Sequence, residues 1–221
     1  MSKSLGAALA LAALALTGCG AIQTGAAATV GEETISLERV DEVTSDFCSA
    51  VTPQLEEQAE TIPHGFFRSG IAGTLALRSV ADQLAEDYGV EPDSDQYLQA
   101  MADLRGGLQS VPEDYRDSVI EVESAPPYVE AVQAAVGEVV LDGEGEYADF
   151  VAAGSDEFET WIAENGVEFA PALDTVVKGG IIESQDGSVS FAVSEVATNG
   201  QVEEPNSMLA RQLPQSQRCG R

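Results

Sequence analysis

The stretch Ala28-Thr29-Val30-Gly31-Glu32-Glu33-Thr34-Ile35-Ser36 decides the fold of this chain. Its residues alternate around Gly31-Glu32-Glu33, which predicts a short strand or a tight hairpin. Ser36 is a favourable N-cap, and the apolar residues after it recur at helical spacing, so a long helix should begin there and reach about Ile62. The chain therefore passes at Ser36 from a small β-structure into helices.

Five further helices are predicted from apolar spacing and from the Gly and Pro residues that interrupt it. They cover roughly Phe67 to Tyr88, Ser94 to Gln109, a short segment after Pro112, Pro126 to Leu141, and Glu144 to Glu164. Two β-prone segments follow, Gly166 to Ala170 and Ser188 to Val193, with Gly179-Gly180 and Asp186-Gly187 as turn signals between them. The predicted fold class is α+β, mostly α, with a small β-sheet formed by the N- and C-terminal segments.

The N-terminus has the form of an export signal. Lys3 precedes an apolar run from Leu5 to Leu16 that is too short to span a bilayer as a helix. Leu16-Thr17-Gly18-Cys19 resembles a bacterial lipobox. The resemblance implies that residues 1–18 are a lipoprotein signal peptide and that acylated Cys19 holds the protein in the lipid bilayer, on the extracytoplasmic face of the cell membrane. The alternative is an ordinary secretory leader with Cys19 as a stray thiol.

Composition limits the partners. The chain has 38 acidic and 10 basic residues, and its net charge of −28 repels phosphate backbones, so we expect no nucleic acid partner. The acidic excess could attract cationic partners, but solubility or a saline habitat explains it equally well. Residues 19–28 are rich in Gly and Ala and are predicted to be a flexible tether. Residues 29–197 form the predicted helical domain with terminal strands, and 198–221 form a polar tail.

The predicted leader gives the three cysteines two different roles. If Cys19 carries lipid, Cys48 and Cys219 remain as an even pair in an oxidising compartment, where a disulfide is the expected state. The bridge would hold the tail against the first helix. Because the closed loop spans most of the domain, chain entropy gives roughly 5 kcal/mol as an upper figure for its stabilisation.

Residues 28–36, followed by Val40 and Asp41, resemble the entry into SurA-type chaperone domains, where a strand, a turn and Ile-Ser lead into a long helix. Val167-Glu168-Phe169-Ala170-Pro171, after a long aromatic-bearing helix, resembles the segment that closes this domain in SurA, PrsA and trigger factor relatives. The likeness covers roughly Ala28 to Pro171, although Ala172-Leu173 stands where the family often has an Arg/Tyr-Gly pair. It implies a holdase for unfolded or newly exported polypeptides, with hydrophobic grooves between its helices. Too few residues follow Pro171 for a parvulin domain, so we expect no prolyl isomerase activity.

We expect no enzyme, cofactor or metal site. His64 is the only histidine, no Gly-x-Ser-x-Gly elbow is present, and Cys48 as a nucleophile would need an activating base. The acidic loop Asp142-Gly143-Glu144-Gly145-Glu146 fails the EF-hand pattern at its sixth position, Tyr147, and at its twelfth, Ala153. Two functions remain: a holdase-like lipoprotein, and a non-catalytic cell-envelope lipoprotein that docks one protein partner or small ligand.

Overall fold

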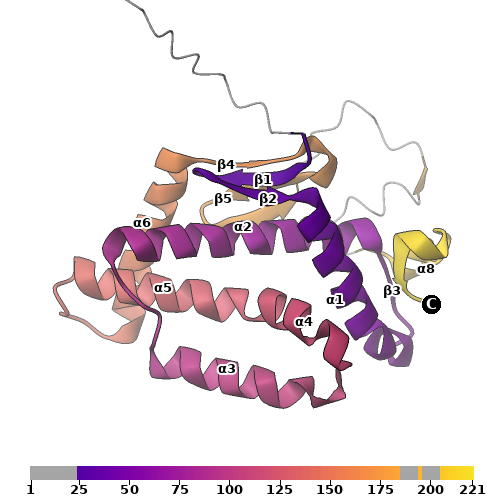
Figure 1. Ribbon diagram of the computed structural model, residues 1–221, viewed down its shortest axis with the longest axis horizontal. Coiled ribbons are helices and arrows are strands. Elements are labelled where there is room, and N and C mark those ends of the chain that lie inside the picture. The colour runs from indigo at the N-terminus through magenta and orange to yellow at the C-terminus, as the bar shows by residue number, and fades with distance from the viewer. Residues whose placement is uncertain (1–23, 185–193, 196–204) are drawn as a thin grey trace, which may run out of the picture.

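Helices dominate the structure, a computed structural model that describes residues 24–184, 194–195 and 205–221. Figure 1 shows two of the small sheets along one side of the long central helix α2 (His64–Tyr88) and further helices on its other side, while β3 (Thr61–Pro63), from the third sheet, lies near the N-terminal end of α2. The predicted α+β fold, mostly α, is confirmed. The strands of the described residues form three separate antiparallel sheets rather than the single small sheet that was predicted.

The N-terminal hairpin consists of β1 (Ala26–Val30) and β2 (Glu33–Ser36), joined by Gly31 and Glu32. Gly31 has a φ of +56°, which suits a two-residue hairpin turn with glycine first. The other edge of β1 pairs with β4 (Val167–Phe169), so the strand order is β2-β1-β4. Of the two sequence alternatives, the hairpin is correct, and β4 lies within the predicted Gly166 to Ala170.

The predicted tether of residues 19–28 is too long at its C-terminal end. Ala26, Ala27 and Ala28 belong to β1 and are 3, 0 and 0 % exposed. Ala27 belongs to the hydrophobic cluster that includes α1 (Leu37–Glu57), and Ala28 belongs to the cluster that includes α5 (Ala125–Val140) and α6 (Tyr147–Asn165). A strand whose neighbouring residues are buried in two different clusters has room only for small side chains, which is why a sequence that looks like a linker forms part of the core.

Helix α1 (Leu37–Glu57) begins as predicted, because the Ser36 hydroxyl accepts a hydrogen bond of 3.1 Å from the backbone N–H of Arg39. It ends five residues before the predicted Ile62, where the chain turns through Ala59 at a φ of +54°. The residues expected to finish the helix instead form strand β3 (Thr61–Pro63). A left-handed alanine is not visible in a helical apolar pattern.

The other long helices lie within a few residues of their predicted positions. They are α2 (His64–Tyr88), α3 (Asp95–Gly107), α4 (Arg116–Glu123), α5 (Ala125–Val140) and α6 (Tyr147–Asn165). Gly89 caps α2 in the left-handed conformation, with a φ of +65°. The two hydrophobic clusters share α2: its N-terminal half packs with α1 and α4, and its C-terminal half packs with α5 and α6. Figure 1 shows α3 outermost, beyond α4 and α5.

Two small sheets were not predicted. Strands β5 (Thr175–Lys178) and β6 (Ile181–Ser184) pair around Gly179-Gly180, whose φ angles are +54° and +71°. The predicted strand Ser188 to Val193 lies outside the described residues. In the tail, α8 (Ser207–Ala210) precedes β7 (Arg218–Gly220), which pairs with β3. The described part of the tail therefore belongs to the folded body.

Candidate functional site

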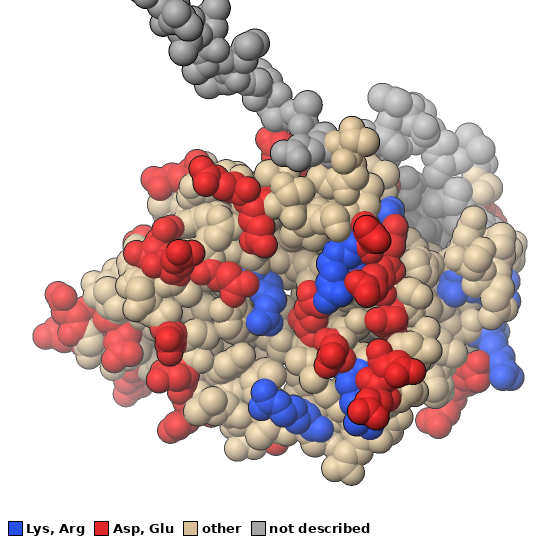
Figure 2. Space-filling view, in the orientation of Figure 1, with Lys and Arg blue, Asp and Glu red and all other residues tan. Residues whose placement is uncertain are grey.

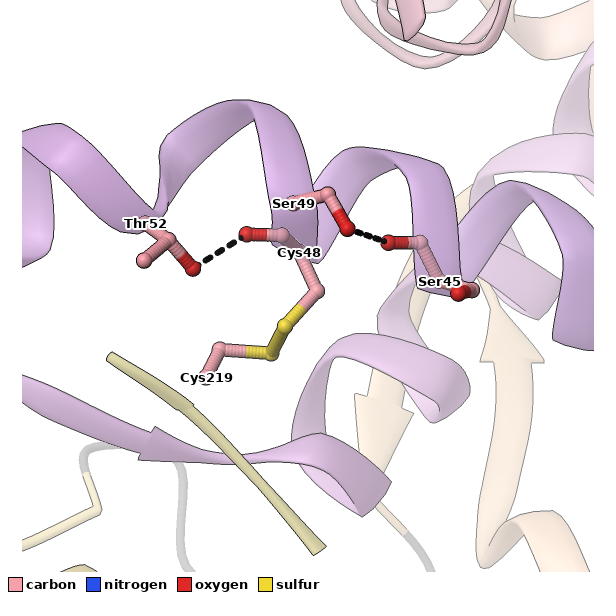
Figure 3. The surroundings of a disulfide bond; sticks show 5 residues. All are labelled: Ser45, Cys48, Ser49, Thr52 and Cys219. Atoms are coloured by element: carbon pink, nitrogen blue, oxygen red, sulfur yellow. Dashed lines mark hydrogen bonds between the residues drawn. A yellow bond between two sulfur atoms is a disulfide. The ribbon is translucent and has the colours of Figure 1, made fainter. Parts of the chain in front are cut away.

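The structure joins Cys48 and Cys219, the two cysteines that the sequence leaves for a bridge. Cys48 comes from the middle of α1 and Cys219 from β7, and their Cα atoms are 5.5 Å apart (Figure 3). Cys219 is 1 % exposed. The neighbouring hydroxyls donate within their own helix, from Thr52 to the Cys48 carbonyl at 2.7 Å and from Ser49 to Ser45. The disulfide therefore cross-links β7 to the middle of α1. Cys19 lies outside the described residues.

The other candidate residues from the sequence lie at the starts of helices. Half-buried His64 begins α2, and burial lowers its pKa despite the nearby carboxylate of Asp41. Glu146 and Asp149 form a capping box at the start of α6, which gives the acidic loop a role in the helix terminus. Across residues 24–184, 194–195 and 205–221, no three His, Cys, Asp or Glu side chains gather as a metal site would require. Within the same residues, no helix has the length and apolar character needed to cross a membrane.

A groove beside strand β2 is the candidate functional site. It encloses about 320 Å³. Its lining comes from β2, the first turn of α1, one face of α2, and α4. The lining residues are Glu33, Thr34, Ile35, Ser36, Arg39, Leu75, Arg78, Ser79, Asp82 and Glu121. Figure 2 shows Lys and Arg side chains set among acidic ones across this face of the molecule. Because β2 is an edge strand and its whole length lines the groove, the groove includes a sheet edge that no strand of the described residues covers.

The backbone of Thr34 faces this open edge. In an antiparallel hairpin with a two-residue turn, the pair next to the turn exchanges its backbone hydrogen bonds, and the following pair does not. Val30 and Glu33 are the first pair here, and Thr29 and Thr34 are the second. Thr34 therefore directs its backbone N–H and C=O away from β1, and Thr34 is exposed to solvent.

Each carboxylate of the groove accepts a hydrogen bond from the protein itself. Ser79 donates to Glu33, and Arg39 donates to Glu121. The second terminal nitrogen of Arg39 is 2.7 Å from Glu42, so this guanidinium lies between two carboxylates. Tyr128 donates to Asp82 at 2.5 Å. The acidic side chains and Arg39 are thus already paired within the fold.

Arg78 is the exception. Its guanidinium carbon lies 4.4 Å from the ring centroid of Tyr128, and its Nη1 donates to the Ser124 hydroxyl at 3.0 Å. Within the described residues it forms no ion pair, although Asp82 lies one turn further along the same helix. Arg78 is not among the residues predicted from the sequence. Its position among the apolar residues of α2 was a usable signal, but the lack of an acidic partner is visible only in the fold.

Tyr128 supports this arrangement and is predicted to titrate abnormally. Burial raises the pKa of its phenol, and the hydrogen bond to Asp82 raises it further. A raised pKa stabilises the fold below pH 10, and this contribution is lost as the pH rises through the folded-state pKa. We expect phenolate absorbance to show a late-titrating group in the folded protein. Tyr128→Phe should remove the group that titrates last and leave Tyr88 and Tyr147, whose pKa values are also raised, and urea should return all of them to the ordinary range. Identical folded titration curves for the wild type and Tyr128→Phe would contradict this.

Comparisons with known protein families, with curated proteins and with solved structures found no match for this chain. The chemistry of the groove is therefore inferred from its own residues.

Proposed function

We propose that this chain is a membrane-anchored extracytoplasmic lipoprotein that binds exported polypeptides in the manner of a holdase, without prolyl isomerase activity. The anchor would be acylated Cys19, in the lipobox-like Leu16-Thr17-Gly18-Cys19. The SurA-type resemblance of residues 28–171 supports a polypeptide as the ligand. The observation that carries the proposal is the open edge of β2 along the groove.

An exposed strand edge binds a polypeptide by adding it to the sheet as a further strand. Such binding uses backbone N–H and C=O groups, which every client possesses, so it tolerates many sequences. The outward groups of Thr34 are suited to this role, and β1 and β4 hold β2 in place from behind. An extended segment beside β2 would lie over Leu75 and Arg78 of α2.

The expectation of hydrophobic grooves between helices receives little support from the described surface. Only Ile35 and Leu75 are apolar among the groove residues. The large exposed apolar side chains are scattered over α3, the end of α5, β6 and α8. They are Leu98, Val139, Val140, Ile181 and Met208. Binding through a strand edge needs no continuous apolar patch, so it fits this surface better.

The polar lining favours a second candidate, in which the protein docks one partner of matching charge. Fixed charges discriminate among partners, because a wrong pairing leaves a charge desolvated. Client breadth separates the two functions. A holdase suppresses the aggregation of several unrelated unfolded proteins at near-stoichiometric ratio, whereas a specific docking protein captures one dominant partner and leaves their aggregation unchanged.

The matched variants Thr34→Pro and Thr34→Val test whether binding uses the β2 edge. Proline removes the outward N–H, whereas valine keeps it and suits a strand. We expect Thr34→Pro to lose most of the suppression of aggregation of unfolded test proteins, and Thr34→Val to retain it, with both variants melting near the wild type. Equal suppression by the two variants would rule out strand addition at β2.

A further inference from the structure

We infer that the groove selects extended segments that carry an acidic side chain, and that Arg78 binds the carboxylate. This inference rests on the proposed function, because it assigns a sequence preference to the same site. The occupant is an internal segment of polypeptide that lies beside β2, with one Asp or Glu side chain directed toward α2.

The position of Arg78 suits this role. The ring of Tyr128 lies 4.4 Å from its guanidinium carbon, and Ser124 engages one of its terminal nitrogens at 3.0 Å. Tyr128 is itself held by Asp82. These contacts orient the planar group and leave its other N–H donors directed at no described side chain. A guanidinium matches a carboxylate with two parallel hydrogen bonds, so orientation in advance favours that ligand.

No carboxylate of the described residues pairs with Arg78. Arg39 already lies between Glu42 and Glu121, and Glu33 accepts from Ser79. In the described residues, Glu33 and Asp82 each accept a hydrogen bond from a hydroxyl, and Glu121 is paired with Arg39. Arg78 is the one charged group of the groove lining that has no carboxylate partner there. Arg78 is also partly buried, where an unpaired charge is less well solvated than at the surface. A carboxylate from the ligand would offset this deficit.

The net charge of the chain limits how many acidic residues the bound segment can carry. At −28, the protein repels segments that carry many acidic residues. The preferred segment therefore has one acidic side chain among neutral or basic neighbours, so that the local contact with Arg78 is not cancelled by long-range repulsion.

The test uses blocked peptides of alternating Thr and Val with a central Asp or Asn, titrated into the purified full-length chain and followed by fluorescence anisotropy. A charged hydrogen-bonded contact corresponds to about tenfold or more in affinity, so the Asp peptide should bind at least that much tighter than the Asn peptide. Arg78→Gln should bring the ratio close to one. Arg78→Lys should keep part of it, because lysine has the charge without the planar fork. Arg105→Gln, which removes an exposed arginine of α3, is the matched control and should preserve the ratio.

Three outcomes would overturn the inference. Equal binding of the Asp and Asn peptides, with binding abolished by N-methylation of alternate backbone amides, removes the role of Arg78 and leaves strand addition intact. If an Asn peptide with a free C-terminal carboxylate binds as tightly as the blocked Asp peptide, Arg78 recognises chain ends and not acidic side chains. Failure of every peptide to bind the wild type overturns the proposed function together with the inference.

Discussion

Gly154→Ala should lower the free energy of unfolding by about 3 kcal/mol, or prevent folding altogether. A Cβ atom at this position would lie 1.8 Å from the carbonyl oxygen of Gln133 on α5. The clash is with backbone, so no side-chain rotation relieves it, and α5 and α6 would have to move apart. Gly137 has the reciprocal position, since its Cβ would lie 1.8 Å from the Phe150 carbonyl oxygen. Gly137→Ala should therefore have a similar effect.

Urea denaturation followed by circular dichroism measures this effect, with Gly106→Ala as the control. Gly106 lies near the end of α3, and a Cβ there would meet nothing within 4 Å. Because alanine is the better helix former, Gly106→Ala should leave stability unchanged or raise it by up to about 1 kcal/mol. If Gly154→Ala unfolded at the same urea concentration as Gly106→Ala, the close packing of α5 against α6 would be contradicted.

The second large effect is expected from the double variant Cys48→Ala/Cys219→Ala. The bridge joins residues 171 positions apart, and for such a loop the chain-entropy estimate gives roughly 5 kcal/mol of lost stability. The loss should be felt first where β7 pairs with β3, because the bridge holds β7 against α1. Thr61 is fully buried there and donates to the Arg221 carbonyl.

Thermal unfolding with and without a thiol reductant measures the contribution of the bridge. The reductant should lower the melting temperature of the wild type to that of the double variant and should not affect the variant. Hydrogen exchange at β3 should accelerate before exchange in α2. A wild type that melts at the same temperature in both conditions would show that the bridge contributes nothing to stability.

The positions of the helices and three of their ends were the most predictable part of the fold, whereas the C-terminal end of α1 was not. Ser36 and Ser94 cap α1 and α3 through their hydroxyls, and Gly89 ends α2, as local sequence patterns indicate. These features depend on residues three or four positions apart, so they can be read from the chain directly. The hairpin could be predicted for the same reason, because its turn lies within it.

The remaining features depend on contacts between distant residues. Strand β3 has three residues and exists because β7 pairs with it, and no local pattern in Thr61–Pro63 predicts that partner. Ala27 and Ala28 resemble a linker until β1 packs into the two hydrophobic clusters. The importance of Arg78 depends on which carboxylates its neighbours have already engaged, and that pairing arises only when β2, α1, α2 and α4 come together.

The distance along the chain between Cys48 and Cys219 also determines how early the disulfide can form. At about 5 to 20 residues per second, the second cysteine is synthesised roughly 10 to 30 s after the first. Throughout that interval the thiol of the early helix is without its partner while the intervening helices are made. The covalent step must therefore come late in maturation, and a partly made chain is without this cross-link.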